Sequence, residues 1–486
     1  MEGSLAPYPA VMSNSGMSDD VTSTPEMPGV AKHDPDRPAA LLEFMTTGWA
    51  PRETDLPDEH PAAAHRAHRR AALAHRFQGE RLVIPTGGYK TRANDTEYRF
   101  RPATEFAHLV GSHEPDAVLV VQDGRSVLYQ APVMDRTTPA FFTDRVYGEL
   151  WVGPRPSLEA TAALLGVPTR PLAELDTLSG PARVVRGYDP RVEALFETDP
   201  DADAELTTFL SELRLVKDAH EIAELQKAVD ATVLGFEDVV RQLDAARATS
   251  ERWVEGVFGL RARVEGNDVG YGSICAAGSH ACTLHWTDND GPVRDGDLML
   301  LDMGVESHEL YTADVTRTVP VNGTFTPRQR EVYQLVYDAQ EAGIAACKPG
   351  ADFLDPHRAA MRVLAYGLVS LGVLTDAEAA LAEDAQLYRR YTLHGVSHML
   401  GLDVHDCAHA RQETYRKGPL EVGYVLTVEP GLYFQPDDLT VPADLRGIGV
   451  RIEDDIVITQ DGCRNLSAAL PRDPDAVEAW MRGLSS

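Results

Sequence analysis

The stretch Gly447–Thr459, GIGVRIEDDIVIT, places charged side chains inside a segment that otherwise has the composition of a buried β-strand. Its apolar positions, such as Ile452 and Val457, are β-branched, and such residues pack well on a pleated surface. Arg451 and Glu453 alternate with them, which predicts a strand with one polar face. An ionised carboxylate in a buried strand is costly unless a positive group compensates it. From this segment alone, a solvent-facing polar stripe and an Arg451–Glu453 pair both remain open.

Three further acids lie in or beside C-terminal segments that are expected to be buried strands. Asp302 ends the apolar run DLMLLD, Asp314 precedes the segment VTRTVP, and Glu429 is embedded in YVLTVEPGLYF. Together with the acid of the opening stretch they make four buried carboxylates in one domain. Arg317 and Arg451 can offset two of these charges at most. Bound divalent metal is therefore the expected source of the remaining positive charge.

The segment YTLHGVSHMLGLDVHD supplies three histidines, His394, His398 and His405, between these acids. Gly395 stands where the HExxH motif of zinc peptidases has glutamate, so the catalytic base must come from another part of the chain. One imidazole with several carboxylates suits Mn²⁺, Co²⁺ or Zn²⁺. Acids with bridging capacity suit two ions about 3.5–4 Å apart that share a hydroxide nucleophile. The residues therefore predict a dinuclear metallohydrolase.

Five separated blocks agree in order with a known family. The blocks LLDMG, TADVTRTVPVNG, HGVSHMLGLDVHD, LTVEPGLY and RGIGVRIEDDIVIT resemble those of the Xaa-Pro aminopeptidases (aminopeptidase P), which are pita-bread metallopeptidases. The likeness extends from the start of the 59–208 region to the C-terminus. It implies an α/β (α+β) chain, with an N-terminal mixed α/β domain followed by a catalytic domain whose two pseudo-symmetric halves surround a curved antiparallel sheet.

The resemblance also implies five metal ligands. They fall on Asp302, Asp314, His398, Glu429 and Glu453. In this arrangement Asp314 and Glu453 bridge two divalent ions, Asp302 holds one of them, and His398 with Glu429 holds the other. The ion implied by the resemblance is Mn²⁺. Glu453 would then lie in an apolar segment because it binds two cations, which compensate its charge.

Other site roles follow from the same resemblance. Glu429 is the expected general base, and His285, His394 and His405 are expected to bind substrate and stabilise the developing oxyanion. Because Glu429 lies near the metals, its proton transfer is a property of the whole cluster.

Three further residues are expected to support substrate binding without taking part in the reaction. Arg451 would orient a ligand carboxylate. Tyr433, in EPGLY, is expected in the site, with a core tyrosine as the alternative. Trp151, in ELWVGPRPS, matches a tryptophan that in similar bacterial enzymes reaches a neighbouring subunit's active site, so a homo-oligomer (dimer or tetramer) is expected. The alternative for Trp151 is a buried core residue.

The activity implied is release of the N-terminal residue from peptides that have proline in the second position. A bond preceding proline is a tertiary amide that lacks the N–H, so a dedicated site is needed for it. A prolidase that cleaves Xaa-Pro dipeptides on the same fold is the alternative. A metal-free binding module is disfavoured because all five ligand positions carry ligand residues.

Composition sets the remaining expectations. Residues 1–58 are rich in Pro, Ser, Thr, Asp and Gly and are predicted to be disordered, except for a short helix within Ala39–Trp49. Helical periodicity over Ser211–Ala246 predicts two helices that open the second domain, so the domains are 59–208 and 209–486.

The net charge of −30, from 45 basic and 75 acidic residues, disfavours nucleic acid and anionic membranes as partners. The sequence has no apolar run long enough for a transmembrane helix. Five cysteines without a CxxC motif fit a reducing cytoplasm.

Overall fold

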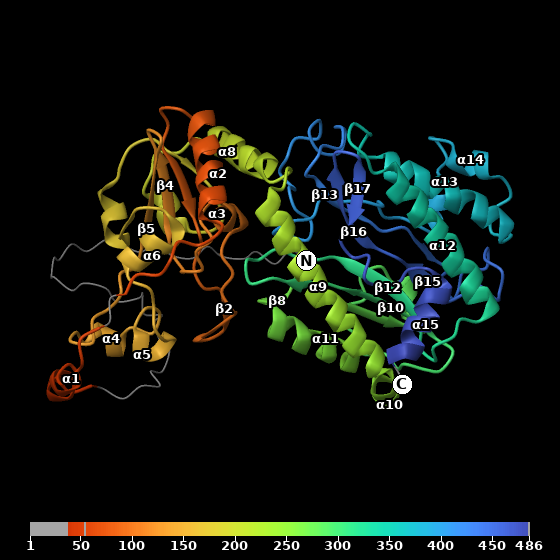
Figure 1. The fold of residues 1–486 in the computed structure, drawn as a ribbon, viewed down its shortest axis with the longest axis horizontal. Coiled ribbons are helices and arrows are strands. Elements are labelled where there is room, and N and C mark those ends of the chain that lie inside the picture. Colours follow the sequence, from red (N-terminus) through yellow and green to blue (C-terminus); the bar gives the residue numbers. More distant parts are fainter. Residues whose placement is uncertain (1–36, 53–54, 485–486) are drawn as a thin grey trace, which may run out of the picture. The chain divides into compact units, whose positions relative to one another are not determined.

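The computed structural model describes residues 37–52 and 55–484. Residues 1–36, for which disorder was predicted, lie outside the described residues. The chain divides into two compact units, one of Met1–Arg52 with Met134–Gly153 and one of Glu53–Val133 with Pro154–Ser486. Each unit is described by itself (Figure 1).

The smaller unit contains the helix expected near the N-terminus. Its helices are α1 (Ala39–Met45), α4 (Ala140–Thr143) and α5 (Glu149–Val152). Trp49, just after α1, packs against Phe141 and Phe142 with ring centroids 6.3 and 6.0 Å apart. Arg52 donates two hydrogen bonds to Glu149, at 2.9 and 2.8 Å. The segment around α1 thus docks on residues 134–153.

A five-stranded sheet forms the N-terminal part of the larger unit. Its order is β6-β5-β4-β1-β7, antiparallel at the centre and parallel at both edges. Along β4, Leu119 and Val121 belong to one hydrophobic cluster and Val118 and Val120 to another. This alternation follows from the two-residue period of a strand and means that both faces of the sheet are covered. The bounds are β1 (Leu82–Pro85), β2 (Thr91–Ala93), β3 (Thr96–Glu97), β4 (Val118–Gln122), β5 (Arg125–Gln130), β6 (Thr169–Pro171) and β7 (Arg183–Val184), with α2 (Ala63–Arg76), α3 (Thr104–Leu109), α6 (Leu158–Leu165), η1 (Leu172–Thr177), α7 (Pro190–Ala194) and α8 (Pro200–Leu213).

The C-terminal part consists of two halves, each built of antiparallel strands and long helices. In the first half, α9 contacts β11 and α11 contacts β8 and β9, whereas in the second half α12 contacts β13, β14 and β15, and α13 packs on α12 (Figure 1). The strands pair antiparallel as β12-β10-β9, β13-β16-β17, β14-β15 and β11-β8. This is the arrangement expected of a pita-bread domain. The helices are α9 (Ala219–Arg241), α10 (Leu243–Ala248), α11 (Glu251–Glu265), η2 (Gly278–Cys282), α12 (Pro327–Ala346), α13 (Asp355–Ser370), α14 (Ala377–Leu381), η3 (Leu387–Arg390) and α15 (Pro474–Leu484). The strands are β8 (Asp268–Val269), β9 (Ile274–Ala277), β10 (Leu298–Met303), β11 (Val305–Glu306), β12 (Val315–Pro320), β13 (Val425–Val428), β14 (Gly431–Tyr433), β15 (Gly449–Arg451), β16 (Asp454–Thr459) and β17 (Gly462–Asn465).

Local sequence explains where the long helices begin. α9 starts with a capping box, in which Asp218 accepts from the backbone of Glu221 and Glu221 accepts from the backbone of Asp218. α12 starts the same way at Thr326 and Gln329, with Pro327 in its first turn. The prediction of two helices over 211–246 is confirmed by α9 and α10. Among the residues that the structure describes, no helix is long and apolar enough to cross a membrane.

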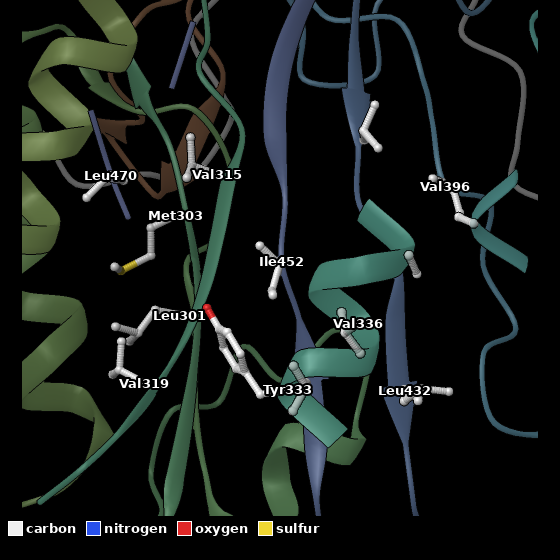
Figure 2. Packing of buried hydrophobic residues seen from close by; sticks show 14 of the residues in the cluster. Leu301, Met303, Val315, Val319, Tyr333, Val336, Val396, Leu432, Ile452 and Leu470 are labelled. Carbon is white, nitrogen blue, oxygen red and sulfur yellow. The ribbon is translucent and has the colours of Figure 1, made fainter. Parts of the chain in front are cut away.

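The hydrophobic core lies directly beneath the predicted site. Figure 2 shows side chains from β10, β12 and α12 gathered around Ile452. On β10 the core residues Leu301 and Met303 flank Asp302, which therefore points from the opposite face of the strand. Packing of one face thus fixes the direction of the acid on the other.

Two segments that were predicted as single strands are each broken in two. Glu429 and Pro430 separate β13 from β14, and Ile452 and Glu453 separate β15 from β16. The backbone N–H of Glu429 donates to Val396 O at 2.8 Å and that of Glu453 to Thr316 O at 3.1 Å. Both acids thus take backbone hydrogen bonds outside the ladder of their own strands, and that of Glu453 reaches β12 in the other half of the domain.

Candidate active site

Four of the five predicted ligands meet in one place. Asp314, His398 and Glu453 each offer one ligand atom, and these atoms all lie within 4.8 Å of one another. His398 Nε2 lies 3.3 Å from Asp314 Oδ2 and 3.6 Å from Glu429 Oε1. These side chains come from the start of β12, the loop before β13 and the two strand breaks.

The fifth predicted ligand, Asp302, lies on the strand next to Asp314. Its Oδ2 accepts a hydrogen bond from Arg451 Nη2 at 2.5 Å, and its Oδ1 accepts one from Tyr271 Oη at 2.7 Å. The Arg451–Glu453 ion pair that the opening stretch left open is not formed, because Arg451 reaches across to Asp302. The solvent-facing alternative for Glu453 is also wrong, since this residue is 2% exposed.

Glu453 carries the strongest sign that positive charge belongs here. Its Oε2 accepts a hydrogen bond from Thr316 Oγ1 at 2.6 Å. Burial, and then the charges of Asp314 and Glu429, raise the pKa of Glu453 well above its usual range. Burial likewise raises the pKa of Asp302. A divalent cation replaces the protons that such crowded carboxyl groups otherwise retain.

His398 has the orientation of a metal-binding imidazole. Its Nδ1 lies 3.2 Å from Met399 O, so an Nδ1–H donated to that carbonyl leaves Nε2 facing the carboxylates. Burial opposes protonation of the ring, but the hydrogen bond to Asp314 and the charge of Glu429 outweigh it and raise the pKa to about 9. The ring thus lies in a strongly negative field.

The two arginines neutralise only one acid of this cluster, Asp302, which Arg451 contacts. Arg317 was expected to be able to offset one of the site acids, but its Nη2 donates to Asp454 Oδ1 at 2.7 Å instead. Arg451 is engaged by Asp302. The donor set is thus four carboxylates and one imidazole with a deficit of positive charge, and it fits divalent metal ions with oxygen and nitrogen ligands.

Tyr433 joins His394 to Arg451. Its hydroxyl lies 2.8 Å from His394 Nε2 and accepts a hydrogen bond from Arg451 Nη1 at 2.9 Å. The ring is 5% exposed and packs in a small hydrophobic cluster. Burial raises the pKa of Tyr433 to about 12, so the hydroxyl stays protonated at neutral pH. Its side chain is therefore both packed in the core and hydrogen-bonded at the site.

The remaining predicted histidines lie around the cluster. His394 Nδ1 is 3.4 Å from Glu429 Oε2. The ring of His405 stands edge-on to that of His398, with centroids 4.4 Å apart. Burial, and then the nearby charge of His398, lower the pKa of His405, so this imidazole is neutral at pH 7. His285 is exposed and close enough for its charge to add to that shift.

Sequence reasoning missed the residue that anchors the loop of His285. Glu251, on α11, is fully buried, and both its oxygens are used. Its hydrogen-bond partners are Ala277 N at 2.7 Å, His280 Nδ1 at 2.9 Å, Trp286 Nε1 at 2.8 Å and Gly291 N at 2.7 Å. No local pattern reveals this role, because these partners lie between 26 and 40 residues further along the chain.

Trp151 belongs to the smaller unit and is not a buried core residue, which corrects the alternative left open above. It lies in α5 and is 42% exposed. Its Nε1 donates to Phe142 O at 2.8 Å, and Arg145 lies over its ring at 4.8 Å from the centroid. The indole is thus held in place with part of its surface free.

A pita-bread domain with carboxylates and an imidazole gathered at its centre is that of a metallohydrolase. Residues 223–460 match the model of metallopeptidase family M24, and residues 66–181 match the aminopeptidase P N-terminal domain. Xaa-Pro aminopeptidase 1 of Streptomyces coelicolor is 59% identical over 456 residues, which are 91% of this chain and 92% of that protein. The Xaa-Pro aminopeptidase of Escherichia coli is 36% identical over 445 residues, 85% of this chain and 96% of that protein.

Solved structures agree with this comparison. Aminopeptidase P from Escherichia coli with the inhibitor Pro-Leu superposes with a TM-score of 0.77 at 32% identity, covering 88% of this chain and 99% of that one. The chain therefore belongs to metallopeptidase family M24 and, within it, to the Xaa-Pro aminopeptidases. It is a metal-dependent hydrolase that releases N-terminal residues, and the prolidase alternative is not favoured.

Proposed function

We propose that Asp302, Asp314, His398, Glu429 and Glu453 hold two Mn²⁺ ions, which serve the removal of an N-terminal residue that precedes proline. The observation that carries this proposal is the convergence of ligand atoms from Asp314, His398 and Glu453 within 4.8 Å. Such ions, when bound, activate a water molecule and polarise the scissile carbonyl. Oxygen and imidazole ligands suit Mn²⁺.

Glu429 moves the proton. Although burial opposes ionisation, its hydrogen bond with His394 and the charges of His394 and His398 lower its pKa, so the carboxylate is ionised at neutral pH. It can therefore accept a proton from the attacking water. Amide cleavage requires that the leaving nitrogen be protonated, and the same carboxyl group can deliver this proton to the prolyl nitrogen.

The imidazoles bind the peptide around the scissile bond. His405 is neutral and offers an N–H to a carbonyl oxygen of the substrate. His394 is held by Tyr433 and lies beside Glu429, so it can donate to the oxygen that becomes negative in the transition state. His285, on the loop that Glu251 anchors, is proposed to contribute a further contact to the substrate.

Selectivity for proline suits this chemistry. The bond that precedes proline has no N–H, so a site that accepts it relies on the ring and on the carbonyl oxygens. The free α-amine of the substrate is a cation and is attracted to the surrounding carboxylates. This attraction restricts cleavage to the first residue.

The decisive measurement compares an Xaa-Pro-Yaa tripeptide with the Xaa-Pro dipeptide. We expect chelator-treated enzyme to be inactive and Mn²⁺ to restore cleavage of the first bond of the tripeptide, because the ligand cluster requires divalent cations. An Xaa-Ala-Yaa tripeptide is the control for the proline requirement. Equal cleavage of the alanine control would contradict the proline selectivity, and cleavage of the dipeptide alone would make the enzyme a prolidase.

We further propose that the enzyme is a homo-oligomer in which Trp151 extends to the active site of another copy. Its partial exposure and its fixed Nε1 hydrogen bond support this role. Replacement Trp151→Ala should raise KM several-fold and leave metal content unchanged, with Trp253→Ala, an equally exposed tryptophan on α11, as the control. Light scattering that gave a monomer at assay concentration would contradict the proposal.

A cytoplasmic location is also proposed. All five cysteines are free, and Cys275, Cys282, Cys347 and Cys407 are buried as thiols. Buried thiols without disulfides suit a reducing compartment. Recovery of the enzyme outside the cytoplasm in cell fractionation would contradict this location.

A further inference from the structure

A cavity of about 240 Å³ is lined in part by the loop that carries His394. Its walls are the first turn of α13, the segment around η3 and residues 393–397, and Arg416 closes it. A Cβ built on Gly395 would lie 3.8 Å from Arg416 Nη2, so this guanidinium stands over the residue next to His394. The cavity and the active site therefore share one loop.

The charged groups of this cavity are all basic. Its titratable residues other than Tyr388 are His357, Arg389, His394 and Arg416, and no Asp or Glu lines it. This is unusual in a chain with 75 acidic and 45 basic residues. The positive surroundings also act on His357, because burial, followed by the charges of His394 and Arg389, lowers its pKa to about 4.

Both arginines lack a carboxylate partner in the described part of the chain. Arg389 donates only to the neutral Gln386 Oε1, at 3.1 Å, and Arg416 has no hydrogen-bond or ion-pair partner. Their neighbours differ. Arg390 donates two hydrogen bonds to Asp438, at 2.8 and 3.0 Å, and Arg411 is bound by Glu212. Unpaired guanidinium groups on one cavity are ready to bind an anion.

Two buried polar atoms in the wall also lack partners. Among the described residues, His357 Nδ1 and Ser397 Oγ are buried without any hydrogen bond. Ser397 is 9% exposed. Buried polar atoms are almost always paired, so these two call for a polar ligand in the cavity.

The two ends of the site carry opposite charge. The carboxylate cluster attracts the α-ammonium group of a peptide, whereas the basic cavity repels it. A peptide that enters with its amine at the metal centre therefore presents its leaving portion to the loop 393–397. We propose that the basic cavity is a subsite for a carboxylate on the leaving portion of the peptide substrate, bound by Arg389 and Arg416. This inference rests on the peptidase activity proposed above and adds to it a preference among peptides.

The carboxylate has two possible sources, the C-terminus of a short peptide or an acidic side chain. Four substrates separate them: Ala-Pro-Ala, its C-terminal amide, Ala-Pro-Glu amide and Ala-Pro-Gln amide. We expect the Mn²⁺-loaded enzyme to prefer the acid over the amide, or the Glu peptide over the Gln peptide, by about tenfold in kcat/KM, the factor of one charge-assisted contact.

The variants Arg389→Gln and Arg416→Gln should remove most of this preference through KM. They should leave the neutral amides unaffected and metal content unchanged. Arg390→Gln is the matched control. It removes the same charge from the residue next to Arg389, but Arg390 is already paired with Asp438. An equal kcat/KM for charged and neutral peptides in the wild-type enzyme would overturn the subsite alone. So would a loss of the preference in Arg390→Gln as large as in the other two. If no peptide of the four is cleaved, the proposed peptidase specificity fails and the subsite fails with it.

Discussion

Replacement Glu453→Gln is expected to abolish metal loading and to lower turnover by at least about 10³-fold, more than the loss of a single hydrogen-bond donor produces. Glutamine keeps the shape of the side chain and can still accept from Thr316 Oγ1, which now lies at 2.6 Å from Glu453 Oε2. What it loses is the negative charge that would face two cations at once. The measurement is metal content by mass spectrometry together with the initial rate on a proline tripeptide.

In metal-free protein, the same substitution should stabilise the fold at neutral pH. Because the pKa of Glu453 is raised, the folded state keeps a proton that the unfolded chain releases above the ordinary carboxyl pKa. This loss of stability is absent below the pKa of the unfolded chain. It grows as the pH rises from there towards the raised pKa of the folded protein. Between about pH 5 and pH 8, the melting temperature of chelator-treated wild-type protein should therefore fall further than that of the variant.

Glu306→Gln is the control for this experiment. Glu306 is also buried with a raised pKa, but it is bound by Arg101 and Asn267, away from the cluster. That variant should keep its metal. Retention of both metal and activity in Glu453→Gln would refute the two-metal arrangement.

Replacement His394→Ala is expected to leave metal bound and to slow turnover by about 10²–10³-fold, the scale of one lost oxyanion donor. His394 touches Glu429 and Tyr433 and is not one of the three residues whose ligand atoms converge. Because the interaction strengthens only in the transition state, kcat and kcat/KM should fall together. Single-turnover rates and metal content check this expectation.

Tyr433→Phe separates the direct role of His394 from its positioning. This variant removes the hydroxyl that lies 2.8 Å from His394 Nε2 and keeps the packed ring. We expect a loss smaller than that of His394→Ala. If His394→Ala instead loses its metal, then His394 rather than His398 is the ligand, and the two histidines must exchange roles.

Local patterns predicted individual helices and strands, whereas the arrangement of the domains was predicted from the family resemblance. The capping residues before α9 and α12, and the apolar runs of β10 and β16, are visible within short windows of sequence. The breaks at Glu429 and Glu453 were not predicted. Each depends on a backbone hydrogen bond to a segment far away in the sequence, such as that from Glu453 N to Thr316 O. Alternation of residue types carries no information about such a partner.

The candidate site divides in the same way. Residues that are chemically out of place, such as an acid in an apolar strand, can be recognised from sequence, and Asp302 and Glu453 are of this kind. Residues that act through distant partners cannot. Glu251 looks like an ordinary acid at the start of a helix, Arg317 gives no sign that it pairs with Asp454, and Arg389 differs from Arg390 only by a missing partner.

The candidate site is complete only when both halves of the pita-bread domain are present. Asp302 and Asp314 belong to the first half of the pita-bread domain, whereas His398, Glu429 and Glu453 come from the second, and Glu453 is close to the C-terminal end of the chain. A polypeptide that stops before residue 453 therefore lacks the last of the five proposed ligands. Truncation within the second half is therefore expected to remove activity completely rather than in part, because each half alone holds only some of the ligands.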